Sequence, residues 1–526
     1  MTNIPKEPAR PELIFALVGA AGTRLTKLAA QIEKSLDQFG YQTTNIRLSD
    51  VLPRFSGWTE QGSSGEFERI SHLQEMGNAF RSRLGDGAAL ARAGIARIRE
   101  ERAKLTGNAD TPASNRAYVL RQLKHPDEVE LLRETYGSNF LLVAGHAPEK
   151  IREDELANEM ARIANRPGRE SDYRGKACQI ILDDEKQADD LGQNTRDTYP
   201  KADFFANLAK DWGELSVSRF VDLLFGHPFH TPLPDEYVLY LAHAASLRSS
   251  DDNRQVGAAI ADVRFGNKKK NADVIAVGMN EVPRAGGGSY WQEDSVDARD
   301  QALALDKDQD RAKEIKTSAL AELIERIRDD GLLNPTSSSS DASEIARVLL
   351  PKLNGTQFKD IGEFSRPVHA EMAALIDAAR RGISVDGKTM YVTTFPCHNC
   401  GKHIIASGIR QVIYLEPYPK SRTKDLYREE IDLEAVEREE DHDLVRFFAY
   451  TGIAPRQYQR LFSMVKRGAK KGLPLKEWNS NKRSLSPVDI PAHSSFAYVR
   501  AEREALEGLP TKHYDWDKDT ICPALT

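Results

Sequence analysis

The chain has 526 residues, more than one hydrophobic core usually organises, with 40% hydrophobic and 29% charged residues, as in globular proteins. Its net charge of -6 gives no global signature of nucleic-acid binding, and no apolar run approaches the roughly 20 residues needed to span a bilayer. Only four cysteines occur, and two lie three positions apart, which favours a metal site in a reducing compartment over disulfides. We therefore expect a cytoplasmic protein of at least two domains that does not enter a membrane.

The N-terminal part of the sequence predicts an open α/β domain over residues 12–225. A buried strand is expected at Leu13–Val18, a glycine turn at 19–23, and a helix over 25–36, where leucine and isoleucine recur at helical spacing. A second strand follows near 41–48, which completes a strand, turn, helix and strand unit. Further strands are expected at Phe140–Ala144 and Gln179–Leu182.

A proline-rich linker is expected at residues 226–234, followed by a second domain over 235–465 and a C-terminal extension over 466–526. The second domain is predicted to contain an insertion at 284–365 with its own helices, one of them at 312–327. The last 45 residues show no clear periodicity. Helices are expected at 235–247, 370–380 and after Cys397, and strands at 256–261, 274–277, 390–394 and 411–416.

Two short motifs in the second domain carry chemistry. His369-Ala370-Glu371 and the later Pro396-Cys397-His398-Asn399-Cys400 match the H-x-E and P-C-x-x-C signature of zinc deaminases. Three protein ligands, His369, Cys397 and Cys400, leave the fourth tetrahedral position of Zn²⁺ open, as in catalytic zinc sites. Two residues between the cysteines allow both thiolates to reach one ion from a single helix start, where the helix dipole favours anionic sulfur.

Glu371 is predicted to be the catalytic residue. Residues two apart on a helix point in different directions, so Glu371 does not readily ligate an ion held by His369. Its carboxylate is then available to move protons for a water molecule that zinc makes acidic. The expected reaction is hydrolytic deamination. The alternative is a structural zinc site, which would need a fourth ligand such as His398 or His403.

These motifs and their surroundings resemble the deoxycytidylate deaminase branch of the cytidine deaminase superfamily. The resemblance also rests on Arg254-Gln255-Val256-Gly257-Ala258, Gly278-Met279-Asn280-Glu281-Val282-Pro283 and Glu416-Pro417-Tyr418-Pro419-Lys420-Ser421. It implies that Asn280 contacts the sugar and base of a nucleoside; an asparagine that only closes the strand is the alternative. Arg254 and Lys420 are candidates for the substrate phosphates, with ordinary surface cations as the competing interpretation.

Both halves together resemble the bacterial anti-phage dCTP deaminases, in which a P-loop kinase-like domain precedes the deaminase. Segments 122–133 and 192–198 contribute to this resemblance. It implies an N-terminal open sheet of the P-loop kinase type, a C-terminal α/β/α sandwich with a helical insertion, and a homo-oligomer. The implied substrates are free deoxycytidine nucleotides, dCTP or dCMP, whose consumption would deplete dCTP during infection. A deaminase acting on single-stranded nucleic acid is the alternative, but the acidic net charge makes a polynucleotide partner unlikely.

The turn after the first strand resembles a degenerate phosphate loop. Gly19, Gly22, Thr23 and Thr26 remain as candidate nucleotide-binding residues, whereas Arg24 and Leu25 stand where an intact loop has Gly and Lys. Loss of the lysine removes the charge that stabilises transferring phosphates, although backbone N–H groups at a helix start still suit an anion. The sequence is therefore consistent with a regulatory nucleotide site or with a purely structural domain.

Overall fold

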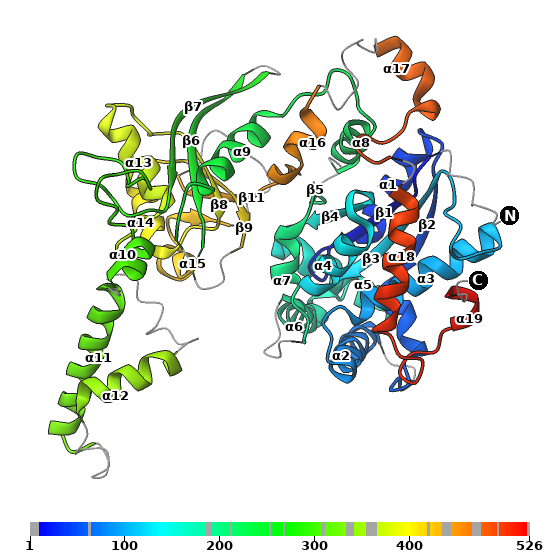
Figure 1. Ribbon diagram of the computed structural model, residues 1–526, viewed down its shortest axis with the longest axis horizontal. Coiled ribbons are helices and arrows are strands. Elements are labelled where there is room, and N and C mark those ends of the chain that lie inside the picture. The colour runs from blue at the N-terminus through cyan, green and yellow to red at the C-terminus, as the bar shows by residue number, and fades with distance from the viewer. Residues whose placement is uncertain are drawn as a thin grey trace. The chain divides into compact units, whose positions relative to one another are not determined.

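The structure is a computed structural model (Figure 1). It describes residues 10–60, 65–185, 191–209, 213–251, 254–266, 269–307, 311–332, 341–353, 365–417, 421–433, 443–464, 475–491 and 494–522. The chain divides into two compact units. Unit 1 contains Met1–Tyr240, Tyr414–Pro417 and Ile431–Thr526, and unit 2 contains Leu241–Ile413 and Tyr418–Glu430. None of the helices in these ranges is both long enough and apolar enough to cross a membrane.

Unit 1 is built on a six-stranded sheet of order β12-β5-β4-β1-β3-β2. Its first five strands in the chain run parallel, while β12 pairs antiparallel with β5 at one edge. Every residue of β1 is buried, as expected for a central parallel strand covered on both faces. The strands are β1 (Leu13–Val18), β2 (Gln42–Arg47), β3 (Arg116–Leu123), β4 (Phe140–His146), β5 (Phe204–Asn207) and β12 (Gly452–Ile453).

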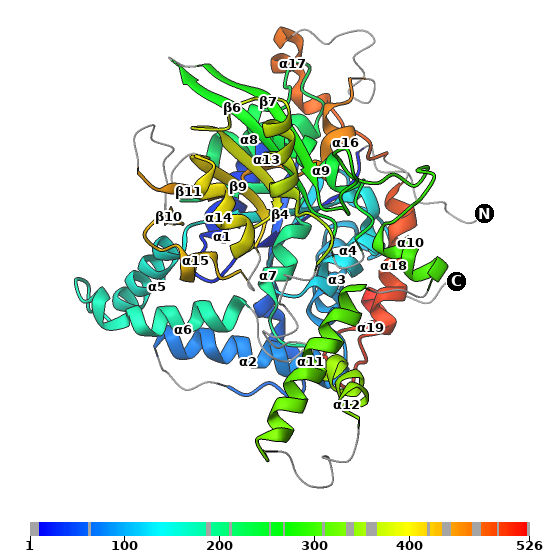
Figure 2. The same ribbon diagram turned by 90° about the vertical axis from the view of Figure 1, so that its left-hand side faces the viewer.

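The helices of unit 1 supply the covering layers. Helix α1 packs against α8, and both contribute to the main core together with β1, β3 and β4. Figure 2 shows α2, α5 and α6 grouped together, and α5 and α6 share a smaller core. The N-terminal helices are α1 (Leu25–Asp37), the 3₁₀ helix η1 (Leu48–Arg54), α2 (Glu66–Leu84), α3 (Ala89–Thr106), α4 (Pro126–Tyr136), α5 (Glu149–Ile163), α6 (Arg174–Glu185), α7 (Thr195–Thr198) and α8 (Gly213–Leu224).

The expected strand at Gln179–Leu182 is wrong, because this segment lies inside α6. Ala177, Ile180 and Ile181 face α5 at helical spacing, while Leu182 is exposed. The three-residue apolar run Ile180–Leu182 fits a strand or a helix equally well, and here packing against the neighbouring helix decides between them.

The C-terminal residues join unit 1 through a helix that showed no periodicity in the sequence. Helix α18 (Ser494–Glu507) buries Tyr498 and Leu506 on one face, but the same face also carries the fully buried Glu502. A charged residue at an inward position hides the apolar pattern of the helix. The other C-terminal helices are α16 (Tyr458–Phe462), α17 (Leu475–Asn481) and α19 (Lys518–Ile521).

Glu502 is buried because two arginines neutralise it. Arg102 of α3 donates two hydrogen bonds to Glu502 at 2.7 and 2.8 Å and further bonds to the buried Glu12. Arg99 donates to Glu502 at 2.8 Å. The cost of burying these charges is offset only when all of the partners are present. Removing any one of them would therefore destabilise the contact between α18 and α3.

The second sheet has the order β10-β11-β9-β8-β6-β7. Strand β6 (Gly257–Gly266) pairs antiparallel with both β7 (Lys269–Met279) and β8 (Thr389–Thr394). Helix α9 (Pro234–Ser246) and β9 (Gln411–Glu416) each contain a boundary between the two units. The remaining strands are β10 (Ile431–Asp432) and β11 (Val445–Ala449).

Helix α13 (Ala370–Arg380) packs closely on β7. A Cβ atom at Gly278 would lie 2.3 Å from the Ala370 carbonyl oxygen and 2.4 Å from the Ala374 nitrogen. Only glycine permits this approach, which fixes the start of α13 against the sheet. Helices α14 (His398–Ala406) and α15 (Thr423–Leu426) follow β8 and β9 in the chain.

The expected insertion contains helices α10 (Asp300–Lys307), α11 (Arg311–Asp329) and α12 (Ala342–Leu349). The helix expected at 312–327 is confirmed by α11. Helices α11 and α12 pack on each other with a small core of their own, formed by Leu320, Ile324, Ala346 and Leu350 among others.

Candidate metal centre and N-terminal cavity

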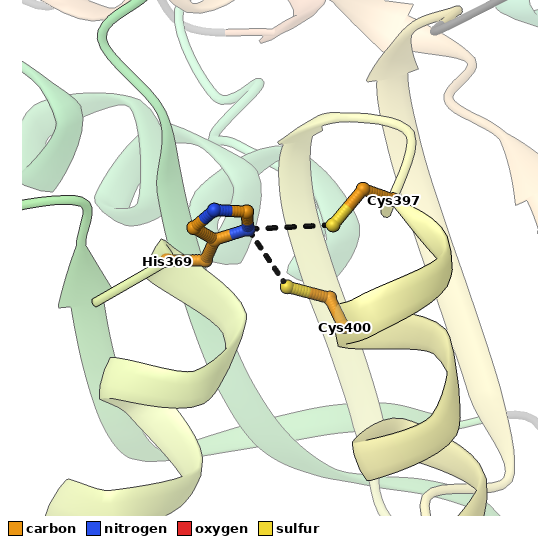
Figure 3. A group of neighbouring side chains, drawn as sticks. All are labelled: His369, Cys397 and Cys400. Carbon is orange, nitrogen blue, oxygen red and sulfur yellow. Dashed lines mark hydrogen bonds between the residues drawn. The ribbon is translucent and has the colours of Figure 1, made fainter. Parts of the chain in front are cut away.

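Three side chains from two helix starts converge in unit 2 (Figure 3). The Sγ atoms of Cys397 and Cys400 each lie 3.3 Å from Nδ1 of His369. All three candidate ligand atoms lie within 4.8 Å of one another. His369 precedes α13, Cys397 precedes α14, and Cys400 lies in the first turn of α14. The structure therefore brings together the three residues that the sequence predicts as ligands.

The positions at helix starts explain why these groups suit a cation. His369 and Cys397 are the N-cap residues of their helices, with extended backbone conformations and no side-chain hydrogen bond to the first turn. Hydrogen bonding to Cys400 lowers the pKa of Cys397 to about 4, and hydrogen bonding to Cys397 raises the pKa of His369 to about 9. Without an ion, Cys397 is therefore favoured as a thiolate, while His369 and Cys400 keep protons that a metal ion would displace on binding.

The donor set fits Zn²⁺. Zinc takes nitrogen at about 2.0 Å and thiolate sulfur at about 2.3 Å, so tetrahedral ligands lie about 3.5 Å apart. The 3.3 Å separations are close to this value. Within the described part of the chain, no fourth His, Cys, Asp or Glu joins this group. Neither His398 nor His403 belongs to it, so the arrangement favours an open catalytic site over a closed structural one.

Glu371 lies in the first turn of α13 and is 4% exposed. Its pKa is raised, first by burial and then by the charge of Cys397. A buried carboxyl group beside metal ligands, but outside the ligand group, has the placement of a residue that exchanges protons with a molecule at the metal.

Asn280 follows β7 and is held in place by the backbone before β6. Its Oδ1 accepts a hydrogen bond from the Val256 N–H at 2.7 Å, and its Nδ2 donates to the Arg254 carbonyl at 2.8 Å. The next residue, Glu281, pairs with Val368 through two backbone hydrogen bonds, which connects this segment to His369. The bonds to residues 254 and 256 are those of an asparagine that closes a strand, and they leave one amide hydrogen for another partner.

The other predicted substrate contacts are less defined. Arg254 is exposed, and Lys420 lies outside the described residues. The segment that follows Lys420 contacts the cysteine motif, because the hydroxyl groups of Ser421 and Thr423 both donate to the Pro396 carbonyl. These two hydroxyl groups position the residue before Cys397, a role that sequence reasoning missed and that no spacing signal revealed.

The degenerate loop lies in unit 1 between β1 and α1. Gly22 has a φ of +82°, and a Cβ atom there would lie 2.4 Å from the Arg152 carbonyl oxygen. The Thr23 hydroxyl is buried without a hydrogen-bond partner in the described structure, and Thr26 accepts from Arg121. A Cβ atom at Gly19 would lie 3.2 Å from the Gly145 carbonyl oxygen, so this position is also tightly packed.

The loop already contacts a carboxylate of the chain itself. The Ala21 N–H donates to Asp184 Oδ2 at 2.8 Å, and Lys124 Nζ lies 2.6 Å from Asp184 Oδ1 and donates to the Gly19 carbonyl. Beside the loop lies a cavity of about 520 Å³. Sequence reasoning missed Lys124, Asp184 and the cavity. The single available signal was the unusual helix α2, whose cavity-facing stripe mixes polar and apolar residues.

Residues 233–416, roughly a third of the chain, match the family model described as the cytidine and deoxycytidylate deaminase zinc-binding region. This match includes all three predicted ligands and Glu371, and it indicates Zn²⁺ as the metal of this region.

Curated relatives match over short segments. The chain is similar to the deoxycytidylate deaminase of Enterobacteria phage T2, with 49% identity over 55 residues, which are 10% of this chain and 29% of the relative. ComE operon protein 2 of Bacillus subtilis is 44% identical over 54 residues, again 10% of this chain and 29% of the relative. The matched segment thus spans less than a third of the length of these relatives.

Among solved structures, the chain is similar to the dCMP deaminase from the cyanophage S-TIM5 in complex with dCMP and dUMP. The sequence identity is 16%, the alignment covers 42% of this chain and 99% of the other, and the TM-score is 0.22. A score at this level supports no argument about the fold.

Proposed function

We propose that the zinc-binding region of the cytidine and deoxycytidylate deaminase family at residues 233–416 catalyses hydrolytic deamination of free deoxycytidine nucleotides. The products would be dUTP from dCTP, dUMP from dCMP, or both. The observation that carries the proposal is the buried Glu371 beside the three-membered group of His369, Cys397 and Cys400. This combination suits a hydrolytic reaction in which one carboxyl group handles the protons.

His369, Cys397 and Cys400 would hold the ion, and Glu371 would move the protons. Zinc, when bound, supplies Lewis acidity that makes a water molecule nucleophilic near neutral pH. Glu371 accepts a proton from the attacking water and passes it to the ring nitrogen next to the carbon under attack. Glu371 then takes the remaining proton of that water from the hydroxyl group now on the ring carbon and delivers it to the departing amino group, so cytosine and water become uracil and ammonia. Burial raises the pKa of Glu371, so its carboxylate, once it has accepted a proton, holds that proton until delivery.

Substrate binding is assigned to Asn280, Arg254 and Lys420. The remaining amide hydrogen of Asn280 suits a sugar hydroxyl or a base edge. Arg254 is exposed in the segment that also carries the carbonyl bonded by Asn280, and a guanidinium group near this segment suits a substrate phosphate. The number of phosphates on the substrate decides how much these cations contribute.

We also propose that the N-terminal residues 12–225 form a P-loop kinase-like domain that reads a nucleotide instead of transferring phosphate. The motivation is the loop with Arg24 and Leu25 in place of the usual Gly and Lys. An enzyme that depletes dCTP harms its own cell unless it is regulated, so a nucleotide-reading domain fits a role in defence against phage. The active form is proposed to be a homo-oligomer.

The substrate class can be tested with purified, zinc-loaded full-length protein. It is incubated separately with dCTP, dCMP, CTP and a cytosine-containing DNA strand, and uracil products are measured. Turnover of dCTP or dCMP with little on the strand supports the proposal. Turnover only on the strand contradicts it and favours the polynucleotide alternative.

A further inference from the structure

The cavity of about 520 Å³ in unit 1 lies where open α/β sheets bind ligands, at the carboxyl ends of parallel strands. Arg47 is the last residue of β2, Gln122 lies near the end of β3, and Gly22 belongs to the turn after β1; all three line the cavity. The volume is within the range of about 300–1,000 Å³ that is usual for small-molecule sites. The position and the volume of the cavity therefore suit a bound small molecule.

The cavity wall has more basic than acidic side chains, and most of its carboxylates already pair with basic groups. The basic residues are Arg24, Lys27, Arg47, Arg69, Arg81 and Lys124, and the acidic ones are Glu66, Glu155, Glu159 and Asp184. Arg47 donates to Gln122 Oε1 at 3.1 Å, and no carboxylate among the described residues pairs with Arg47. Arg121, behind the wall, donates to Thr26 and likewise has no carboxylate partner in the described structure. Burial and the neighbouring charge of Arg69 lower the pKa of Arg47, and Asp50 and Glu66 offset this lowering only in part. An anion beside Arg47 would remove this repulsion.

The loop itself is a poorer place for that anion. Asp184 is almost fully buried, accepts the Ala21 N–H and pairs with Lys124, so one loop donor and the nearest lysine already face a negative charge. A phosphate at this position would meet the Asp184 carboxylate. The guanidinium of Arg47, which forms no ion pair within the described residues, is the better partner.

The rest of the cavity suits the body of a nucleoside. Helix α2 presents a stripe at helical spacing that includes Arg69, Ile70, Leu73, Gln74 and Gly77. Leu48, Leu52 and Leu90 add apolar surface, and Gln74 and Gln122 add carboxamides. A carboxamide offers a donor and an acceptor together, which matches the edge of a nucleobase.

We propose that this cavity binds a nucleoside 5′-phosphate, with the phosphate at Arg47, away from the degenerate loop, and the sugar and base against α2. The inference deepens the nucleotide-reading role proposed for the N-terminal residues. It does not depend on which deoxycytidine nucleotide is deaminated.

The test measures equilibrium binding to zinc-loaded full-length protein without added magnesium. The full chain is used because unit 1 includes Ile431–Thr526. The probes are dAMP, dGMP and dTMP, with thymidine and deoxyribose 5-phosphate as fragments. At least one nucleotide is expected to bind, and each fragment should bind at least about tenfold more weakly, because an ionic hydrogen bond or the base contacts are lost.

Four variants locate the site. Arg47→Gln should weaken nucleotide binding about tenfold, whereas Arg83→Gln, an exposed position on the same helix as Gly77, should not change it. Gly77→Leu should prevent binding by filling the cavity; a Cβ atom there meets Leu90 at an ordinary 3.7 Å, so α2 accepts the change. Asn280→Ala should leave binding intact.

Absence of binding by all three nucleotides would overturn the inference. So would equal affinity in the wild type, Arg47→Gln and Gly77→Leu proteins. Loss of binding in Asn280→Ala would assign the ligand to the deaminase region instead. Because none of these measurements uses deamination, a failure here is distinguishable from a failure of the proposed activity.

Discussion

The metal centre and the N-terminal cavity are built in opposite ways. The metal centre takes His369 and Glu371 from one helix start and Cys397 and Cys400 from another, so a few adjacent positions specify it. The cavity is lined from β2, η1, α2, β3, α5 and α6, which are spread over more than a hundred residues of sequence. Chemistry carried by adjacent residues is readable from spacing, whereas a cavity assembled by topology is visible only after folding.

The two sites also differ in how their charges are arranged. At the metal centre the ligand groups form hydrogen bonds with one another and together suit a cation. In the cavity, Asp184 and Lys124 already satisfy each other, while Arg47 is left without a carboxylate in the described chain. The first pattern suits a fixed ion, and the second suits the reversible anion binding that we propose.

The largest expected effect comes from Glu371→Gln at the metal centre. The amide keeps the shape of the side chain but cannot accept and return protons, so kcat should fall by about 10³-fold or more. Zinc content per chain, measured by elemental analysis, should stay the same. A variant that retains near-wild-type turnover would remove Glu371 from the proton-transfer role.

Glu502→Gln tests the stability of unit 1. Removing one member of the buried cluster leaves Arg99 and Arg102 undercompensated and should cost about 3–5 kcal/mol. The control is Glu504→Gln on the same helix, whose pair with Arg500 is exposed and is worth about 0.5 kcal/mol or less. Denaturant unfolding followed by tryptophan fluorescence reports the difference, because Trp478 and Trp516 are buried in unit 1. Equal midpoints for the two variants would contradict the assignment.

Gly278→Ala tests the contact between β7 and α13. The added Cβ has no room against Ala370 and Ala374, so α13 must shift and carry Glu371 with it. A displacement of this kind can cost about 10²-fold in kcat/KM. Gly175→Ala in α6 is the matched control, since nothing lies near its Cβ position and activity should not change. Unaltered activity in Gly278→Ala would show that α13 adjusts without disturbing the site.

Arg254→Ala should have the smallest effect. If its guanidinium meets a substrate phosphate in solvent, kcat/KM should fall by about tenfold or less, mainly through KM. Comparing the change in KM for dCMP with the change for dCTP shows which phosphate Arg254 contacts. An unchanged KM for both nucleotides would show that Arg254 is an ordinary surface cation that does not contact the substrate.

The sequence predicted the parts of the fold whose signals are local. The strands at Leu13–Val18 and 390–394 and the helix at 370–380 are confirmed almost to the residue, because each has an uninterrupted pattern. The segment at 179–182 was misassigned because its two isoleucines fit either period until α5 packs on them. Helix α18 was missed because the buried Glu502 interrupts its apolar face.

The candidate site shows the same division. The spacing of His369, Cys397 and Cys400 was enough to predict that they meet. Nothing in the spacing indicates that the Asn280 side chain bonds to residues 254 and 256, or that Ser421 and Thr423 hold Pro396. These contacts depend on where separate strands end, which is a property of the whole sheet.

The inclusion of Ile431–Thr526 in unit 1 has a consequence for synthesis on the ribosome. Residues 241–413, which form most of unit 2, emerge after the first segment of unit 1, while the N-terminal sheet still lacks β12 and α18. Until Glu502 is synthesised, Arg99 and Arg102 lack the carboxylate with which both of them pair. A chain interrupted before residue 494 lacks Glu502, so its unit 1 should be less stable and more readily cleaved by proteases than that of a chain that includes α18.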